Sequence, residues 1–142
     1  MAKTKKRGSG QGSRQLVLAT DYPYVVRSYK ADFEESGFDA RIVSDAEVLL
    51  QMLRNDDVAV LVIVGGPLGN WDKLPNASTS NGGRLAAVAA VKWVMREKSV
   101  DTPVVFIETG YTVATFGPKW IRINYIPTFP QLLAAVRRVL AA

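Results

Sequence analysis

The stretch that decides the fold is Val58-Ala-Val-Leu-Val-Ile-Val-Gly-Gly-Pro-Leu-Gly69, in which seven apolar residues run directly into a glycine-rich turn. An apolar run of this kind is typical of a strand buried on both faces, as in a parallel sheet covered by helices. In many α/β domains such a strand ends on an acid, a serine or a phosphate-binding loop. Here the end of the strand carries no reactive side chain, so we expect the strand to have a structural role.

The segments on either side alternate between strand and helix patterns. Strands are expected at 15–20, 39–44, 58–64, 103–107 and 120–126. Helices are expected at 24–36, from 44 to about 55, from 82 or 83 to about 98, and from Pro130 onward, whereas 111–117 is weakly helical at best. This alternation predicts a three-layer, doubly wound α/β fold with a five-stranded parallel sheet. Right-handed crossovers favour the flavodoxin-like strand order 2-1-3-4-5.

The helix patterns also predict which residues face the sheet and where two helices begin. Ser44 and Glu47 have the spacing of a capping box at the start of the second helix. Pro130 suits the first turn of the last helix, and Gly37 is expected to end the first. The residues expected to face the sheet are Val25, Tyr29 and Phe33, then Val48, Leu49, Met52 and Leu53, then Leu85, Val88, Val91 and Met95, and finally Leu132, Leu133, Val136, Val139 and Leu140.

The composition excludes several classes of function. The 142 residues include no cysteine and no histidine, which excludes disulfides, thiolate zinc sites and catalytic mechanisms that use either side chain. No apolar run is long enough to cross a membrane, and no apolar segment follows the basic N-terminus as in a secretory signal. We therefore expect a cytoplasmic protein that is not an enzyme and has no cofactor.

The positive charge is concentrated at the N-terminus. Residues 1–14 contain Lys3, Lys5, Lys6, Arg7 and Arg14 and no acid, so they account for the net charge of +5. We expect a disordered basic tail at 1–14 and a single, electrically neutral domain at 15–142. The tail is either a solvated leader or a weak nucleic-acid contact made through Lys3, Lys5, Lys6 and Arg7.

Three segments of the domain resemble response-regulator receiver domains. The run from Leu16 to Pro23, LVLATDYP, is similar to the first receiver strand, with Asp21 at the second acidic position and Thr20 in place of the first. The run 102–107 resembles the Pro-led fourth strand, and 125–130 resembles the closing turn before the last helix. The resemblance implies the receiver fold and a role in two-component signal transduction.

The departures from the receiver pattern concern the phosphorylation chemistry. Receivers accept a phosphoryl group on an aspartate at the end of the third strand, where this chain has Val62, Ile63, Val64 and Gly65. The family's lysine falls near 126–128, which reads Ile-Pro-Thr, and its serine or threonine falls near Glu108, one residue before Thr109. The resemblance therefore implies a degenerate pseudo-receiver that lacks the phospho-acceptor.

The carboxyl ends of the strands are the expected ligand crevice of such a sheet. The candidate crevice residues are Thr20, Asp21, Gly65, Gly66, Glu108 and Thr109. Asp21 and Glu108 together are a weak candidate for a hydrated Mg²⁺ site, but Asp21 is more simply explained as a helix cap. No metal site is predicted.

Two further regions are candidate binding surfaces. The 65–83 loop is long for this type of connection and contains Trp71, but it lacks the spacing of a P-loop. It is either a lid or partner contact or a mobile insertion. The last third of the domain is a candidate partner or homodimer surface, with Tyr111, Phe116, Lys119, Trp120, Arg122 and Arg137. Alternatively, Trp120 covers the edge of the sheet as part of the core.

The function expected from these features is a non-catalytic regulatory module that acts through protein–protein contact. Two alternatives remain open. One is a nucleic-acid-associated protein that uses the basic tail, and the other is a small-ligand or nucleotide binder at the crevice and the 65–83 loop.

Overall fold

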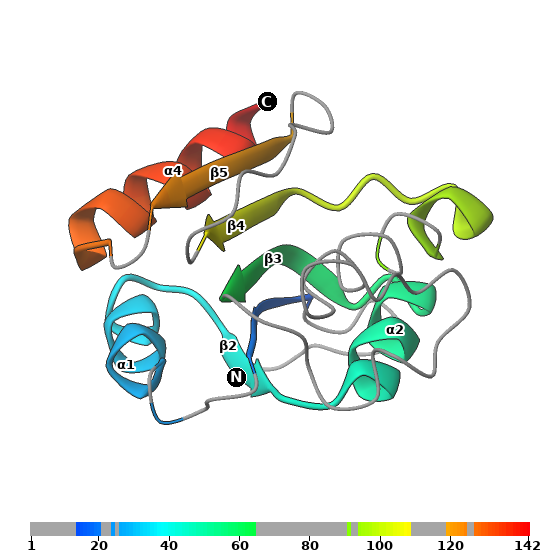
Figure 1. The fold of residues 1–142 in the computed structure, drawn as a ribbon, viewed down its shortest axis with the longest axis horizontal. Coiled ribbons are helices and arrows are strands. Elements are labelled where there is room, and N and C mark those ends of the chain that lie inside the picture. Colours follow the sequence, from blue (N-terminus) through cyan, green and yellow to red (C-terminus); the bar gives the residue numbers. More distant parts are fainter. Residues whose placement is uncertain are drawn as a thin grey trace, which may run out of the picture.

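The computed structural model describes residues 14–20, 24, 26–64, 91, 94–108, 119–124 and 127–142, and of residues 108, 122 and 124 only the backbone. These residues contain a five-stranded parallel sheet with the order β2-β1-β3-β4-β5, which confirms the predicted topology. Figure 1 shows the strands side by side with helices on both faces of the sheet.

The strands lie close to their predicted positions. They are β1 (Gln15–Ala19), β2 (Ala40–Val43), β3 (Val58–Val64), β4 (Val104–Glu108) and β5 (Trp120–Asn124). The central strand β3 has the predicted bounds, and six of its seven residues are buried. The apolar run therefore marks a strand covered on both faces, as the absence of polar alternation indicated.

The buried residues that the structure describes form two clusters, one on each face of the sheet. On one face, α2 (Ala46–Arg54) and the helical residues 94–98 pack on side chains such as Val17 and Leu61. On the other, α1 (Arg27–Glu35) and α4 (Phe129–Ala141) pack on side chains such as Leu16 and Val60. Neighbouring residues along β1 and β3 thus point to opposite clusters, as the two-residue repeat of a strand requires.

Helix α1 is shorter than predicted. It begins at Arg27, with Val26 as the N-cap residue, whereas the sequence predicted a start at Tyr24. Phe33 is fully buried and Tyr29 packs at the margin of the same cluster, while Val25 lies outside the described residues. Gly37 follows the helix with a φ of 97°, the left-handed conformation in which glycine avoids a Cβ clash. The prediction that Gly37 ends the helix is confirmed.

The predicted capping box at Ser44 is wrong. The N-cap of α2 is Asp45, whose carboxylate accepts hydrogen bonds from the backbone N–H groups of Glu47 at 2.8 Å and Val48 at 3.2 Å. Aspartate and serine cap helices about equally well, so residue preference does not choose between them, and the cap is the residue that directly precedes the first helical residue. That residue is Asp45, with φ −117° and ψ 126°.

The buried face of α2 also differs from the predicted one. Leu49, Met52 and Leu53 are buried as predicted, but Val48 is 40% exposed and Leu50, which was not predicted, is 1% exposed. The inward face of the helix is therefore centred on Leu49 and Leu53 and includes Leu50 in place of Val48.

The remaining helical segments agree largely with the sequence. Val91 and Met95 are buried as predicted, while Leu85, Val88 and the predicted helix start at 82 or 83 lie outside the described residues. In α4, Leu132, Val136 and Val139 are buried, Leu133 is partly buried, and Leu140 is 42% exposed, against the prediction. Thr128 caps α4 in a capping box with Gln131, and Pro130 lies in its first turn as predicted.

Arg14 contacts the folded body although the sequence assigned it to the tail. Its Nη2 lies 3.1 Å from the Asp56 carboxylate and 3.4 Å from the carbonyl oxygen of Val58. No helix in the described part of the chain is long and apolar enough to cross a membrane.

Candidate functional site

The candidate crevice lies where the strand order reverses. Strand β1 leads to β2 on one side and β3 lies on its other side, so β1 and β3 adjoin at the switch point that usually holds a ligand in such sheets. Ala19 pairs with Ile63, Val64 with Ile107, and Glu108 with Asn124. The carboxyl ends of β1, β3, β4 and β5 therefore form one row, as predicted from the topology.

Thr20 is the described candidate at the end of β1. It is fully buried, and its backbone N–H donates a 3.0 Å hydrogen bond to the carbonyl oxygen of Val43 in β2. Thr20 therefore lies at the rim but is not exposed to solvent. Asp21, which follows it in the sequence, lies outside the described residues.

The end of β3 presents apolar side chains to the middle of the row. Val62 is fully buried, Ile63 is 1% exposed and Val64 is 6% exposed. From Val58 to Trp71 the sequence contains no acid and no hydroxyl side chain. The middle strand therefore contributes neither a carboxylate nor another oxygen nucleophile to the rim.

Several other crevice candidates lie beyond what the structure describes. Gly65, Gly66 and Thr109 lie outside the described residues, and Glu108 is described only as the last backbone position of β4. The metal interpretation of Asp21 with Glu108 therefore stays a sequence-based expectation. Among the residues that are described, no three acids lie close enough together to hold a metal ion.

A hydrogen bond next to this rim joins α1 to the turn between β5 and α4. The Tyr29 hydroxyl donates to the carbonyl oxygen of Pro127 at 2.6 Å. One turn further along α1, the Phe33 ring lies edge-on to Phe129 with 4.9 Å between centroids. The two contacts fasten the start of α4 against α1. Sequence analysis placed Tyr29 and Phe33 on the core face but could not identify partners about a hundred positions away.

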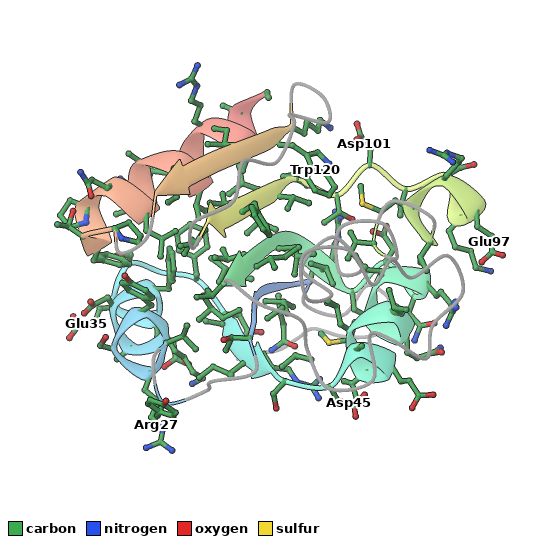
Figure 2. All side chains as sticks on the ribbon, viewed as in Figure 1. Arg27, Glu35, Asp45, Glu97, Asp101 and Trp120 are labelled. Carbon is green, nitrogen blue, oxygen red and sulfur yellow. The ribbon has the colours of Figure 1, made fainter. Side chains whose placement is uncertain are left out.

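The predicted partner surface is divided between the two sides of the sheet. Trp120 is partly buried and, like Val100, packs against the core cluster on the α2 side of the sheet. Arg137 is exposed on α4, which covers the opposite face. Figure 2 shows Trp120 on the side of the sheet away from α4. These two residues therefore belong to different surfaces.

The remaining interface candidates are described only in part. The Lys119 ammonium lies 3.3 Å from the Asp101 carboxylate in an ion pair at the amino ends of β4 and β5. Arg122 is described only as backbone within β5, and Trp71, Tyr111 and Phe116 lie outside the described residues, as do Lys3, Lys5, Lys6 and Arg7 of the tail.

Comparison with known proteins identifies the fold. No protein-family model matches the chain, and no curated protein sequence matches it. A response regulator receiver protein from Sinorhizobium medicae WSM419 superposes with a TM-score of 0.63 at 21% identity, covering 92% of this chain and 96% of that chain. The receiver domain of a Francisella response regulator gives 0.62 at 13% identity, covering 91% and 98%. The pseudo-receiver domain of the CikA protein gives 0.52 at 16% identity, covering 92% and 98%. The chain has the receiver fold.

Proposed function

We propose that this protein is a pseudo-receiver, a regulatory module of two-component signalling that acts by protein–protein contact without phosphorylation of an aspartate. The observation that carries the proposal is the end of β3. In a receiver fold the acceptor carboxylate belongs at this position, and here the strand ends in buried Ile63 and Val64.

The physical argument is that phosphoryl transfer to a protein requires a nucleophile and a cation at the same point. A carboxylate must attack in line, and Mg²⁺ held by neighbouring carboxylates must offset the charge of the phosphoryl group. Strand β3 offers neither, and Thr20 replaces an acid at the end of β1. The apolar side chains of Ile63 and Val64 would also desolvate an approaching anion without compensating hydrogen bonds.

Intact-mass spectrometry after incubation with acetyl phosphate and Mg²⁺ tests the first half of the proposal. A phosphorylation-competent receiver domain, treated in parallel, is the positive control. We expect no mass increase by a phosphoryl group in this protein. A base-labile phosphoryl adduct on any of its aspartates would overturn the proposal.

Replacement of Val64 by aspartate sharpens that experiment. The variant restores a carboxylate to the end of β3 but leaves the family's lysine and first acid missing, so we expect no phosphorylation. A buried carboxylate without a cationic partner should also lower the stability by several kcal/mol, more than Val64→Ala, which only removes volume. Efficient phosphorylation of Val64→Asp would show that the rest of the machinery is present.

Partner capture tests the second half. We would pass a lysate of the source organism, treated with nuclease, over the full chain and over a variant lacking residues 1–13, which keeps the Arg14–Asp56 contact. A body-mediated module should retain the same protein on both. A partner retained only by the full chain would place the contact in the tail instead.

The charge distribution supports one alternative function. All of the net charge of +5 resides in residues 1–14, and such a segment can neutralise nucleic-acid phosphates. The neutral remainder argues against a large phosphate footprint, so this alternative rests on the tail alone.

A further inference from the structure

Three aspartates surround the point at which the chain enters the sheet. Asp39 comes directly before β2, and Asp56 and Asp57 come just before β3, the two strands that flank β1. The backbone N–H of Gln15 donates to the carbonyl oxygen of Asp57 at 2.9 Å, and that of Leu16 donates to the carbonyl oxygen of Asp39 at 2.8 Å. Both turns are therefore held against the first two residues of β1. We call the three aspartates the acidic margin.

The carboxylates of the acidic margin are open to solvent and only partly neutralised. Asp39 and Asp56 are exposed, and Asp57 is partly exposed. Among the described residues the margin makes one ion pair, Arg14–Asp56 at 3.1 Å, and the other two aspartates make none. Gln15 Nε2 donates to the Asp39 carboxylate at 3.3 Å, but an amide does not compensate its charge. The charges of Asp39 and Asp57 therefore remain available to further cations.

The last cation of the basic tail is already bound at this margin. Arg14 Nη2 lies 3.1 Å from the Asp56 carboxylate and 3.4 Å from the carbonyl oxygen of Val58. Residues 8–13 before it read Gly-Ser-Gly-Gln-Gly-Ser, a composition typical of flexible spacers. The other cations of the tail precede this spacer, with no acid among them: Lys3, Lys5, Lys6 and Arg7.

The length of the spacer keeps these cations close to the margin. Arg7 precedes Arg14 by seven positions. A Gly/Ser-rich chain of that length spans roughly 15 Å on average, and neighbouring strands of a sheet lie about 4.8 Å apart. Tethering over such a distance gives an effective concentration on the order of millimolar. The fixed position of Arg14 therefore holds the remaining cations within reach of Asp39 and Asp57.

We propose that the cations of residues 3–7 bind the acidic margin of their own domain and that this contact competes with nucleic-acid phosphates for the same cations. Exposed charge pairs are individually weak, so the contact is reversible and sensitive to salt. A cation held at the margin cannot neutralise a phosphate, so the contact lowers the affinity of the tail for nucleic acid. The competition rests on the nucleic-acid alternative above, whereas the contact itself depends on neither function.

The arrangement of the acids favours a run of side-chain cations over a single metal ion. Within the described part of the chain, no three acids lie close enough together to hold a metal ion, and the acidic margin is no exception. Its carboxylates come instead from two turns on opposite sides of β1. Several separate cations on one tethered segment match such a distribution, because each can meet a different carboxylate.

Paramagnetic relaxation enhancement measures the contact directly. The chain contains no cysteine, so Thr4→Cys carries a single nitroxide label without removing a charge from the tail. At low salt we expect the label to broaden the backbone amide signals of residues 37–41 and 54–58. Asp39→Asn with Asp57→Asn should lower the enhancement at these amides at least twofold, and high salt should do the same.

A matched pair of substitutions controls for net charge. Glu97→Gln with Asp101→Asn removes two exposed acids ahead of β4, changes the net charge equally and should leave the enhancement unchanged. The amide spectra also establish that both variants are folded. Equal enhancement at residues 37–41 and 54–58 in the two variants at low salt would overturn the contact.

Fluorescence anisotropy with a labelled duplex tests the competition separately. The variant with Asp39→Asn and Asp57→Asn should bind the duplex at least twofold more tightly than the control variant, because its tail cations are released. Equal affinities, or no binding by either variant, would overturn the competition. A difference in relaxation enhancement between the same two variants would still support the contact, so the two failures are distinguishable.

Discussion

The hydroxyl of Tyr29 donates a 2.6 Å hydrogen bond to the carbonyl oxygen of Pro127, which lies 98 positions later in the chain. This bond joins the first helix of the domain to the turn that starts the last helix, and Pro127 is buried. The Phe33–Phe129 ring contact lies beside it. Together they make the position of α4 dependent on α1, although the two helices come from opposite ends of the sequence.

Loss of this hydrogen bond should destabilise the fold measurably. Tyr29→Phe keeps the ring but leaves the buried Pro127 carbonyl without its donor, so we expect the free energy of unfolding to fall by about 1–2 kcal/mol. Urea denaturation measures it. Ser28→Ala, an exposed change in the same helix, should alter stability by less than about 0.5 kcal/mol. Equal effects of the two substitutions would mean that the Tyr29 bond contributes nothing.

The cap of α2 distinguishes between neighbouring residues. Asp45→Ala removes the acceptor for the Glu47 and Val48 N–H groups and should cost about 1 kcal/mol, whereas Ser44→Ala should be close to neutral. Thermal unfolding followed by circular dichroism gives the comparison. If Ser44→Ala were the more damaging change, the capping box predicted from sequence would be right and the observed cap wrong.

Among the residues that the structure describes, two other than glycine have left-handed backbones after helices. Ser99 has a φ of 55° and Asp56 a φ of 56°. In each case the backbone N–H groups of that residue and the next bond back to the helix, which is the Schellman pattern. Ser99→Gly should therefore stabilise the protein by about 0.5–1 kcal/mol, because glycine adopts this conformation without a Cβ clash.

The effect of Asp56→Gly on stability can be compared directly with that of Ser99→Gly. Asp56→Gly removes the same backbone strain but also the Arg14–Asp56 ion pair, whose side chains are 50% and 52% exposed. An exposed pair of this kind contributes about 0–1 kcal/mol, so the gain from Asp56→Gly should be smaller than that from Ser99→Gly. Raising the salt concentration should bring the stability gains of the two substitutions closer together. A larger gain for Asp56→Gly than for Ser99→Gly at low salt would contradict this explanation.

Removal of residues 1–13 tests the role of the basic tail. We expect the shortened protein to keep its unfolding temperature, because Arg14 and its contacts with Asp56 and Val58 remain. If the full chain binds nucleic acid, the truncation should abolish that binding and its dependence on salt. Fluorescence anisotropy with a labelled duplex at several salt concentrations measures this. Salt-dependent binding that survives the truncation would assign the nucleic-acid contact to the folded body.

The residues of the candidate site were predicted unevenly. The position of Thr20 at the end of β1 and the apolar end of β3 both follow from reading strand boundaries in the sequence. The separation of Trp120 from Arg137 could not be predicted in this way, because it depends on which face of the sheet each side chain packs against. For an edge strand and a helix distant in sequence, neither the two-residue repeat of the strand nor the residue type specifies which face of the sheet a side chain packs against.

The sequence by itself determined the order of the elements and the topology. Continuous apolar runs such as Val58–Val64 remain stable only when buried on both faces, and right-handed crossovers between alternating strands and helices leave few possible strand orders. The tertiary structure alone decided the details at the ends of the helices: Asp45 as the cap, Val48 and Leu140 exposed, and Tyr29 bound to Pro127. Periodicity specified the inward side of α2 only approximately, because it predicted Leu49 and Leu53 correctly but not Val48 and Leu50. It cannot specify how far the helix extends past the sheet, because that depends on the backbone path of neighbouring segments that are distant in sequence.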